Sequence, residues 1–208
     1  MRIVISGPDG TGKSTIVKGL HESYAPQGST RISWRRFGFA TARIFNLIGR
    51  QLGWSHYEET PAGPMGYHCY RGLPAQIYIV LAWLDCLLVI IPKWWLCDRL
   101  QRVDTLIIDR YLFDIAADVI LSTDKPRQTL RLFDPLLRRH MSSSACIFLA
   151  CQAAVVTERR PDIVWDRSYP LKARIYRTLR RLYGVPTVDT SHALPEDSVK
   201  YAIRQCES

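Results

Sequence analysis

Short apolar runs alternate with amphipathic segments along most of this 208-residue chain. Runs rich in apolar and β-branched residues predict buried strands at residues 1–6, 30–34, 103–109, 145–150 and 185–189. Apolar residues spaced three or four apart predict helices at residues 13–24, 40–52, 127–140, 169–183 and 195–206, and another that ends near residue 121. Because strands and helices alternate, we expect residues 1–208 to form one domain with a three-layer α/β/α fold and a mostly parallel sheet of about five strands.

One segment that interrupts this alternation is rich in proline and glycine. Residues 58–72 contain these breakers together with aromatic and imidazole side chains, among them Tyr70. Such a composition is typical of a surface loop over a binding site. The aromatic side chains either contact a bound molecule or fasten the loop to the protein.

A second interruption is the most apolar part of the chain, residues 73–100. Its longest uninterrupted apolar run, residues 77–84, is far shorter than the ~20 residues that a membrane span needs. We therefore expect no membrane span, and we interpret the segment as a long buried helix that is bent or broken at Pro92. Asp85 lies within it, and a carboxylate in such surroundings is costly unless it is paired or faces a wet cleft.

A glycine-rich turn connects the first predicted strand to the first predicted helix. Its sequence, Gly-Pro-Asp-Gly-Thr-Gly-Lys-Ser-Thr, fits the phosphate-binding pattern of Gly, any four residues, Gly-Lys and Ser or Thr. The glycines let backbone N–H groups wrap a polyphosphate, and the helix N-terminus adds positive charge. Lys13 would reach the terminal phosphates, and Ser14 would hold Mg²⁺ through its hydroxyl. The motif makes the expected domain a P-loop NTPase. The predicted ATP-binding residues are Gly7, Pro8, Asp9, Gly10, Thr11, Gly12, Lys13, Ser14 and Thr15.

Charged residues also follow the strand predicted at 103–109. Asp109 ends this strand, where a P-loop enzyme keeps the aspartate that helps to hold Mg²⁺. Arg110 comes next, and a guanidinium there is suited to gripping a second anion through two parallel hydrogen bonds. Asp114 and Asp118 are four residues apart and share one face of the next helix, where basic partners would stabilise them.

Positive charge is concentrated in one part of the chain. The formal net charge is +9, and residues 124–181 contain 13 Lys or Arg against 5 Asp or Glu. Such a field attracts nucleic acid, an anionic membrane or a small polyanionic substrate. Residues 153–168 within it carry a proline and several charges before a helix, which is typical of a mobile lid. We therefore favour the small substrate and expect no nucleic-acid partner.

Two further features concern the sheet edge and the cysteines. Arg36 follows the strand predicted at 30–34, so it either faces the crevice beyond the carboxyl ends of the strands or is solvated. The six cysteines form no C-x-x-C pair. Reduced, buried thiols in a cytoplasmic protein explain them best.

Together these motifs resemble the thymidylate kinase family of P-loop nucleoside monophosphate kinases over most of the chain. The P-loop, with an aspartate at its third position, is similar to the loop of that family. Asp109-Arg110-Tyr111 is similar to the family's Asp-Arg-Tyr motif, and Arg159-Arg160-Pro161-Asp162, followed by Arg167, falls where the family has its lid.

The resemblance implies roles for these residues. Asp9 would lie near the sugar of the acceptor, and Arg110 would bind its phosphate. Family members without an arginine in the P-loop place the catalytic one in the lid. The expected catalytic residues are therefore Lys13, Asp109, Arg159, Arg160 and Arg167. The expected metal ligands are Ser14 and Asp109. The expected acceptor-binding residues are Asp9, Arg36, Tyr70, Asp85, Arg110, Tyr111 and Asp114. The implied reaction is the ATP- and Mg²⁺-dependent conversion of dTMP to dTDP, by a cytoplasmic protein that can form a homodimer.

The departures from the family keep two alternatives open. Asp85, Asp114 and Asp118 are carboxylates at places where the family has other groups that meet the nucleotide. A P-loop kinase of the same fold that phosphorylates a sugar or another hydroxyl compound would use such carboxylates to bind hydroxyls. A nucleotide-dependent binding protein that uses the basic residues of 124–181 is the other alternative.

Overall fold

Five parallel strands form the central sheet of the protein, whose computed structural model describes residues 1–34, 40–91 and 103–207. The strands are β1 (Arg2–Ser6), β2 (Thr30–Trp34), β5 (Thr105–Asp109), β6 (Ala145–Ala150) and β7 (Thr187–Asp189). Their order is β2-β5-β1-β6-β7, and each neighbouring pair is parallel. Because β1 is central and Ile5 pairs with both Asp109 and Ile147, the P-loop leaves the sheet between the ends of two neighbours.

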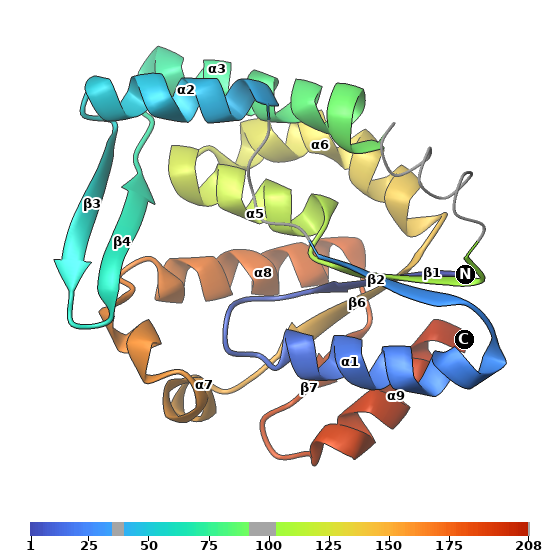
Figure 1. The fold of residues 1–208 in the computed structure, drawn as a ribbon. Coiled ribbons are helices and arrows are strands. Elements are labelled where there is room, and N and C mark those ends of the chain that lie inside the picture. The colour runs from blue at the N-terminus through green and yellow to red at the C-terminus, as the bar shows by residue number, and fades with distance from the viewer. Residues whose placement is uncertain (35–39, 92–102, 208) are drawn as a thin grey trace.

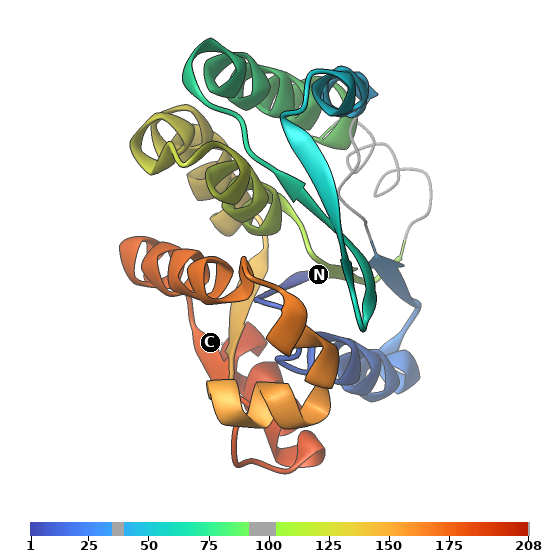
Figure 2. The same ribbon diagram turned by 90° about the vertical axis from the view of Figure 1, so that its left-hand side faces the viewer.

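Helices cover both faces of this sheet (Figures 1 and 2). One side carries α1 (Lys13–Tyr24) and α9 (Pro195–Glu207). The other carries α3 (Gly72–Asp85), α5 (Leu112–Thr123), α6 (Pro126–Met141) and α8 (Tyr169–Tyr183), with α2 (Ala40–Gln51) packed on α3. The short helical segments are η1 (Ala25–Gln27), η2 (Cys86–Ile90), α7 (Ala153–Arg159) and η3 (Pro161–Trp165). The predicted three-layer α/β/α fold is confirmed.

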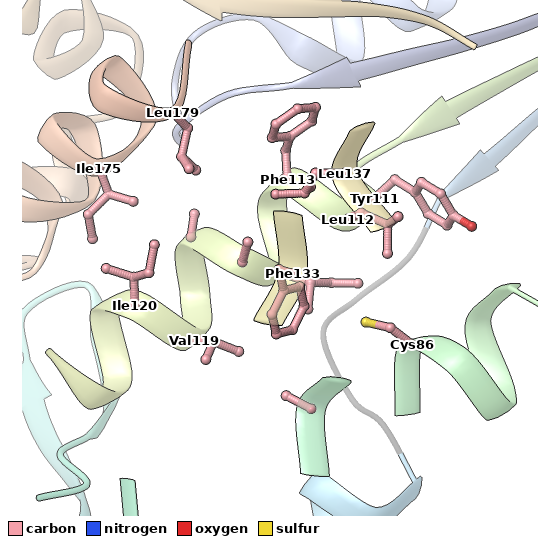
Figure 3. Close-up of a cluster of buried hydrophobic side chains, with 14 of the residues drawn as sticks. Cys86, Tyr111, Leu112, Phe113, Val119, Ile120, Phe133, Leu137, Ile175 and Leu179 are labelled. Atoms are coloured by element: carbon pink, nitrogen blue, oxygen red, sulfur yellow. The ribbon is translucent and has the colours of Figure 1, made fainter. Parts of the chain in front are cut away.

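The larger of two apolar cores lies between the sheet and α3, α5, α6 and α8 (Figure 3). Helix α5 is buried on nearly all sides, which explains why most of its residues are apolar, with Asp114 and Asp118 as the charged exceptions. Near its start, the ring of Phe113 lies 5.0 Å from that of Phe148 on β6. Burial of a phenylalanine side chain contributes roughly 1.5–3 kcal/mol. This packing fixes the start of α5 against the sheet, and Asp109 and Arg110 immediately precede it.

The segment expected to be a loop is instead a β-hairpin, and that prediction was wrong. Strands β3 (Ser55–Thr60) and β4 (Gly63–His68) form a separate antiparallel pair. The proline and glycine mark its turn: Gly63 has φ +104°, and the Thr60 hydroxyl donates to the Gly63 carbonyl at 2.6 Å. Figures 1 and 2 show the hairpin extending from α2 and α3 toward the segment η3.

The described part of the long apolar segment is helical, but with a change of helix type. Helix α3 ends at Asp85, and its last turns continue as a π-helix over Cys86–Ile90. Pro92 and the expected bend lie outside the described residues. Among the helices that the structure describes, none is long and apolar enough to cross a membrane.

Candidate functional site

The glycine-rich turn has the backbone geometry of a phosphate-binding loop. Gly10 and Gly12 have φ of +79° and +81°, a region that favours glycine. A Cβ on Gly10 would lie only 2.6 Å from Val156 Cγ1 on α7, so the turn also packs closely against the predicted lid. The Thr11 hydroxyl donates to the Pro8 carbonyl at 2.8 Å and closes the turn. Gly12 then caps α1, whose N-terminus faces the turn.

Lys13 folds back over this turn. Its ammonium donates to the carbonyls of Gly7 and Pro8 at 2.8 and 2.7 Å and lies 3.8 Å from Asp9 Oδ1. Burial and the nearby Arg110 guanidinium lower its pKa to about 8, although Asp9 opposes the shift. A buried cation held this way is placed to neutralise phosphate charge.

The residues predicted to hold Mg²⁺ fit such an ion. Asp109 is almost fully buried at the end of β5, and its Oδ1 has no hydrogen-bond partner among the described residues. Burial raises the pKa of this carboxyl, while Lys13 and Arg110 oppose the shift. Ser14 is exposed at the start of α1. Carboxylate and hydroxyl oxygens are the ligands that Mg²⁺ prefers.

Beside the P-loop, four charged side chains form a connected chain. Arg110 Nη2 and Lys172 Nζ each bind a different oxygen of Asp9, and Lys172 also lies 3.8 Å from Asp118 Oδ1. Arg110 itself has φ +71°, a strained value for a residue with a side chain. Burial raises the pKa of Asp9, but Lys172, Arg110 and Lys13 outweigh it and hold that pKa well below its usual range.

An open cleft of about 690 Å³ begins at this chain of charges. Asp9, Asp118 and Lys172 lie along it, the hairpin β3–β4 and η3 contribute to its walls, and α5 and α8 contribute their cleft-facing residues. Its volume is in the range of small-molecule sites. Asp9 is the only P-loop residue among the described residues that line it, so the cleft and the phosphate loop meet at that carboxylate.

The three lid arginines have different partners. Arg159 donates to the Thr190 carbonyl at 2.8 Å, on the side of β7. Arg160 lines the cleft and forms two hydrogen bonds with Asp162, at 2.8 and 2.6 Å. Arg167 lines the cleft and donates to Glu58 Oε1 on the hairpin at 3.1 Å. The lid is thus tied both to β7 and to the hairpin.

Asp114 and Tyr111, both predicted to bind the acceptor, are buried and join several elements of the fold. Asp114 is 3% exposed and accepts hydrogen bonds from the Ser6 hydroxyl, the Tyr111 N–H and the Tyr176 hydroxyl, at 2.7, 3.0 and 2.7 Å. Tyr111 is buried, and its ring packs on His140 with centroids 4.5 Å apart. These contacts join β1, α5, α6 and α8, and neither side chain lines the cleft.

Asp85 and Tyr70 also form contacts within the fold and do not line the cleft, and their role in acceptor binding stays a prediction. Asp85 accepts the N–H groups of Thr41 and Ala42, at 3.0–3.2 Å, and the Thr41 hydroxyl at 2.7 Å. It therefore satisfies the free donors at the start of α2. Tyr70 is fully buried, and its hydroxyl donates to Asn46 at 2.6 Å. Arg36, a third candidate, lies outside the described residues.

The sequence analysis did not identify Lys172 or Glu58, whereas Tyr67 is one of the aromatic residues of 58–72 expected either to contact a bound molecule or to fasten this segment to the protein. The Tyr67 hydroxyl accepts the Arg167 N–H at 3.2 Å. A signal for Lys172 did exist: it precedes Ile175 and Tyr176 by three and four residues, which places a lysine on the buried stripe of α8. The hairpin contacts had no local signal, because about 100 residues separate the partners.

Comparison with known proteins supports the fold. The sequence matches no protein-family model and no curated protein. The structure is similar to that of thymidylate kinase from Candida albicans, with a TM-score of 0.56 and 14% identity over 99% of this chain and 90% of that chain. The protein therefore has a divergent version of the P-loop kinase fold seen in thymidylate kinase.

Proposed function

We propose that this protein is an ATP- and Mg²⁺-dependent kinase that phosphorylates a nucleoside monophosphate, with dTMP to dTDP as the leading reaction. The observation that carries the proposal is the position of Asp9. It belongs to the P-loop and also lines the cleft of about 690 Å³. A phosphate donor on the loop and an acceptor in the cleft would therefore meet. The thymidylate kinase-like fold supports the same assignment.

On the donor side, the P-loop N–H groups and α1 would bind the ATP phosphates. Lys13 would leave the loop carbonyls and contact the phosphates nearest the transferred group. Asp109 and Ser14 would hold Mg²⁺ together with phosphate oxygens, and the ion would supply neutralisation of the charge that develops during transfer. The buried Asp109 Oδ1, which has no hydrogen-bond partner among the described residues, supports its role as a Mg²⁺ ligand.

On the acceptor side, the protein has mainly to fix positions and neutralise charge. Arg110 would bind the acceptor phosphate at the inner end of the cleft. Of the three lid arginines, Arg160 and Arg167 line the cleft, whereas Arg159 is held by Thr190. Arg160 is paired with Asp162 and Arg167 with Glu58, so either one would leave its carboxylate partner to act as the catalytic arginine. Closure of residues 153–168 would exclude water from the transfer.

A second candidate function is transfer to a hydroxyl group. Several carboxylates line the cleft, and burial raises the pKa of one of them, Asp118, to about 6, against the pull of Lys172. A carboxyl with such a pKa is suited to accept a proton from a hydroxyl near neutral pH. This reading requires turnover of acceptors that carry no phosphate.

The test is an assay of ATP consumption, coupled to ADP detection, over nucleoside monophosphates and then over nucleosides and sugars. Lys13→Ala should lower turnover by several orders of magnitude while the protein stays folded, because Lys13 is assigned to stabilise transition-state charge. Lys18→Ala on the same helix is the matched control, since Lys18 is 78% exposed and pairs only with Glu22 among the described residues. Near-normal turnover of Lys13→Ala would defeat the kinase assignment, and turnover of nucleosides alone would favour the second candidate.

Three expectations from the sequence stay predictions. These are the single domain over residues 1–208, the cytoplasmic location and the absence of a nucleic-acid partner. A homodimer is also proposed. Helices α2 and α3 expose apolar side chains that such a contact would cover, including Leu47 and Val80.

A further inference from the structure

We propose that Lys172 and Arg110 together form the binding site for the acceptor's phosphate, and that the Asp9 carboxylate occupies this site until the acceptor binds. The inference rests on the proposed monophosphate kinase function and adds to it a residue, Lys172, that determines the class of acceptor.

Each oxygen of the Asp9 carboxylate is bound by a different cation. One carboxylate oxygen accepts a hydrogen bond from Arg110 Nη2, and the other accepts one from Lys172 Nζ at 3.1 Å. The two cations come from different parts of the chain, the end of β5 and the first turn of α8. They converge on two oxygens of a single anionic group, the arrangement that a phosphate also offers. Asp9 is therefore an internal anion bound by Arg110 and Lys172, with the Lys13 ammonium 3.8 Å from the oxygen that Arg110 binds.

Lys172 is mostly buried. Its side chain is 13% exposed, whereas Arg174 on the same helix is exposed to solvent. A buried cation is costly unless it is paired. Burial lowers the pKa of Lys172, but Asp118 and Asp9 raise it by more, so the side chain remains charged. Asp118, 3.8 Å away, would still face Lys172 if Asp9 moved.

Lys172 also has a position that a bound acceptor can reach. Lys172 lines the cleft, and it lies five residues beyond Arg167 at the end of the lid. An acceptor in the cleft can thus reach Lys172 directly. A dianionic phosphate would compete well with the singly charged Asp9 for both cations. A neutral hydroxyl would not, so the site selects acceptors with a phosphate end group.

The experiment compares a monophosphate with its nucleoside, which isolates the contribution of the phosphate. Calorimetric titrations with dTMP and thymidine, in saturating Mg-ADP, give the ratio of the two dissociation constants. If the activity screen identifies another monophosphate as the acceptor, that monophosphate and its nucleoside are used. The variants are Lys172→Gln, Lys172→Arg, Asp9→Asn and, as the matched control, Arg174→Gln. Steady-state KM values for ATP are measured alongside.

Lys172→Gln should weaken monophosphate binding by about 10- to 100-fold, the effect of a charge-assisted hydrogen bond, and leave nucleoside binding and the KM for ATP unchanged. Lys172→Arg should restore much of the loss, and Asp9→Asn should increase the advantage of the monophosphate over the nucleoside. Arg174→Gln should match the wild type.

If the wild-type enzyme phosphorylates a monophosphate, either of two results would refute this inference and leave the proposed function intact. One is an unchanged affinity ratio in Lys172→Gln. The other is an equal rise in the KM for ATP and for the acceptor, which would assign Lys172 to the support of the P-loop. A wild-type protein that phosphorylates no monophosphate would instead refute the proposed function.

Discussion

Substitution of Asp85 tests whether this buried carboxylate anchors helix α2 or binds the acceptor. Asp85 is 1% exposed and accepts two backbone N–H groups and one hydroxyl from the start of α2. Removal of a helix-capping side chain costs roughly 0.5–2 kcal/mol, and loss of a hydrogen bond to a charged group costs about 1.5–3 kcal/mol. Because several of these contacts are lost together and part of the cost is shared, we expect Asp85→Ala to lower the free energy of unfolding by about 3 kcal/mol.

This change is large enough to measure by urea unfolding followed by circular dichroism. For a domain of this length, about 3 kcal/mol corresponds to a fall in Tm of roughly 6–12 °C. Asp85→Asn keeps one acceptor oxygen but loses the charge, so it should cost about half as much. Asp197→Ala is the control, because Asp197 is 61% exposed in a surface pair with Lys200, and it should change stability by less than about 0.5 kcal/mol.

The reasoning fails if Asp85→Ala unfolds at the wild-type urea concentration. If that variant also raised the KM for the acceptor more than tenfold, the result would indicate that Asp85 binds the acceptor.

Two further predictions concern the cleft and its walls. Burial raises the pKa of Asp118 from its ordinary value of 3.8 to about 6 in the folded protein. Because the folded state then binds this proton more tightly than the unfolded state, the free energy of unfolding falls as pH rises from about 4 to about 6. Relative to the wild type, Asp118→Asn should therefore gain stability over that range in urea titrations at each pH, and a constant difference would contradict the assignment. Tyr67→Phe removes the hydroxyl that accepts the Arg167 N–H, so this amide should exchange its hydrogen faster by NMR while global stability changes by less than about 0.5 kcal/mol. Unchanged exchange at Arg167 would show that the Tyr67 hydroxyl does not hold this part of the predicted lid.

Features that depend on neighbouring residues were predictable from the sequence. The five strands and the glycine-rich turn follow from apolar runs and from local backbone requirements, and the structure has them close to the expected positions. The prediction of a surface loop at residues 58–72 was wrong because proline and glycine are as common in the turn of a hairpin as in a loop. The pairing of β3 with β4 that decides between the two depends on cross-strand contacts.

The partners of the buried carboxylates were also difficult to predict from the sequence. The sequence shows Asp85, Asp114 and Asp118 in apolar surroundings, where each needs a partner or a wet cleft. Their partners are 44, 62 and 54 residues away along the chain, at Thr41, Tyr176 and Lys172. Asp114 also accepts the Tyr111 N–H at the start of α5, a capping contact that a local pattern can predict. Only the fold brings the distant partners together, so no local pattern could separate Asp85, which is bound to the start of α2, from Asp118, which lines the cleft.

The sequence by itself determined the three-layer fold and the position of the phosphate loop, because hydrophobic periodicity and glycine conformation act over a few residues. The tertiary structure decided what surrounds that loop: the hairpin wall, the partners of the lid arginines and the convergence of Arg110 and Lys172 on Asp9. Electrostatic interactions depend on distance and burial in space. Residues more than 100 positions apart can therefore share one site without leaving a pattern in the sequence.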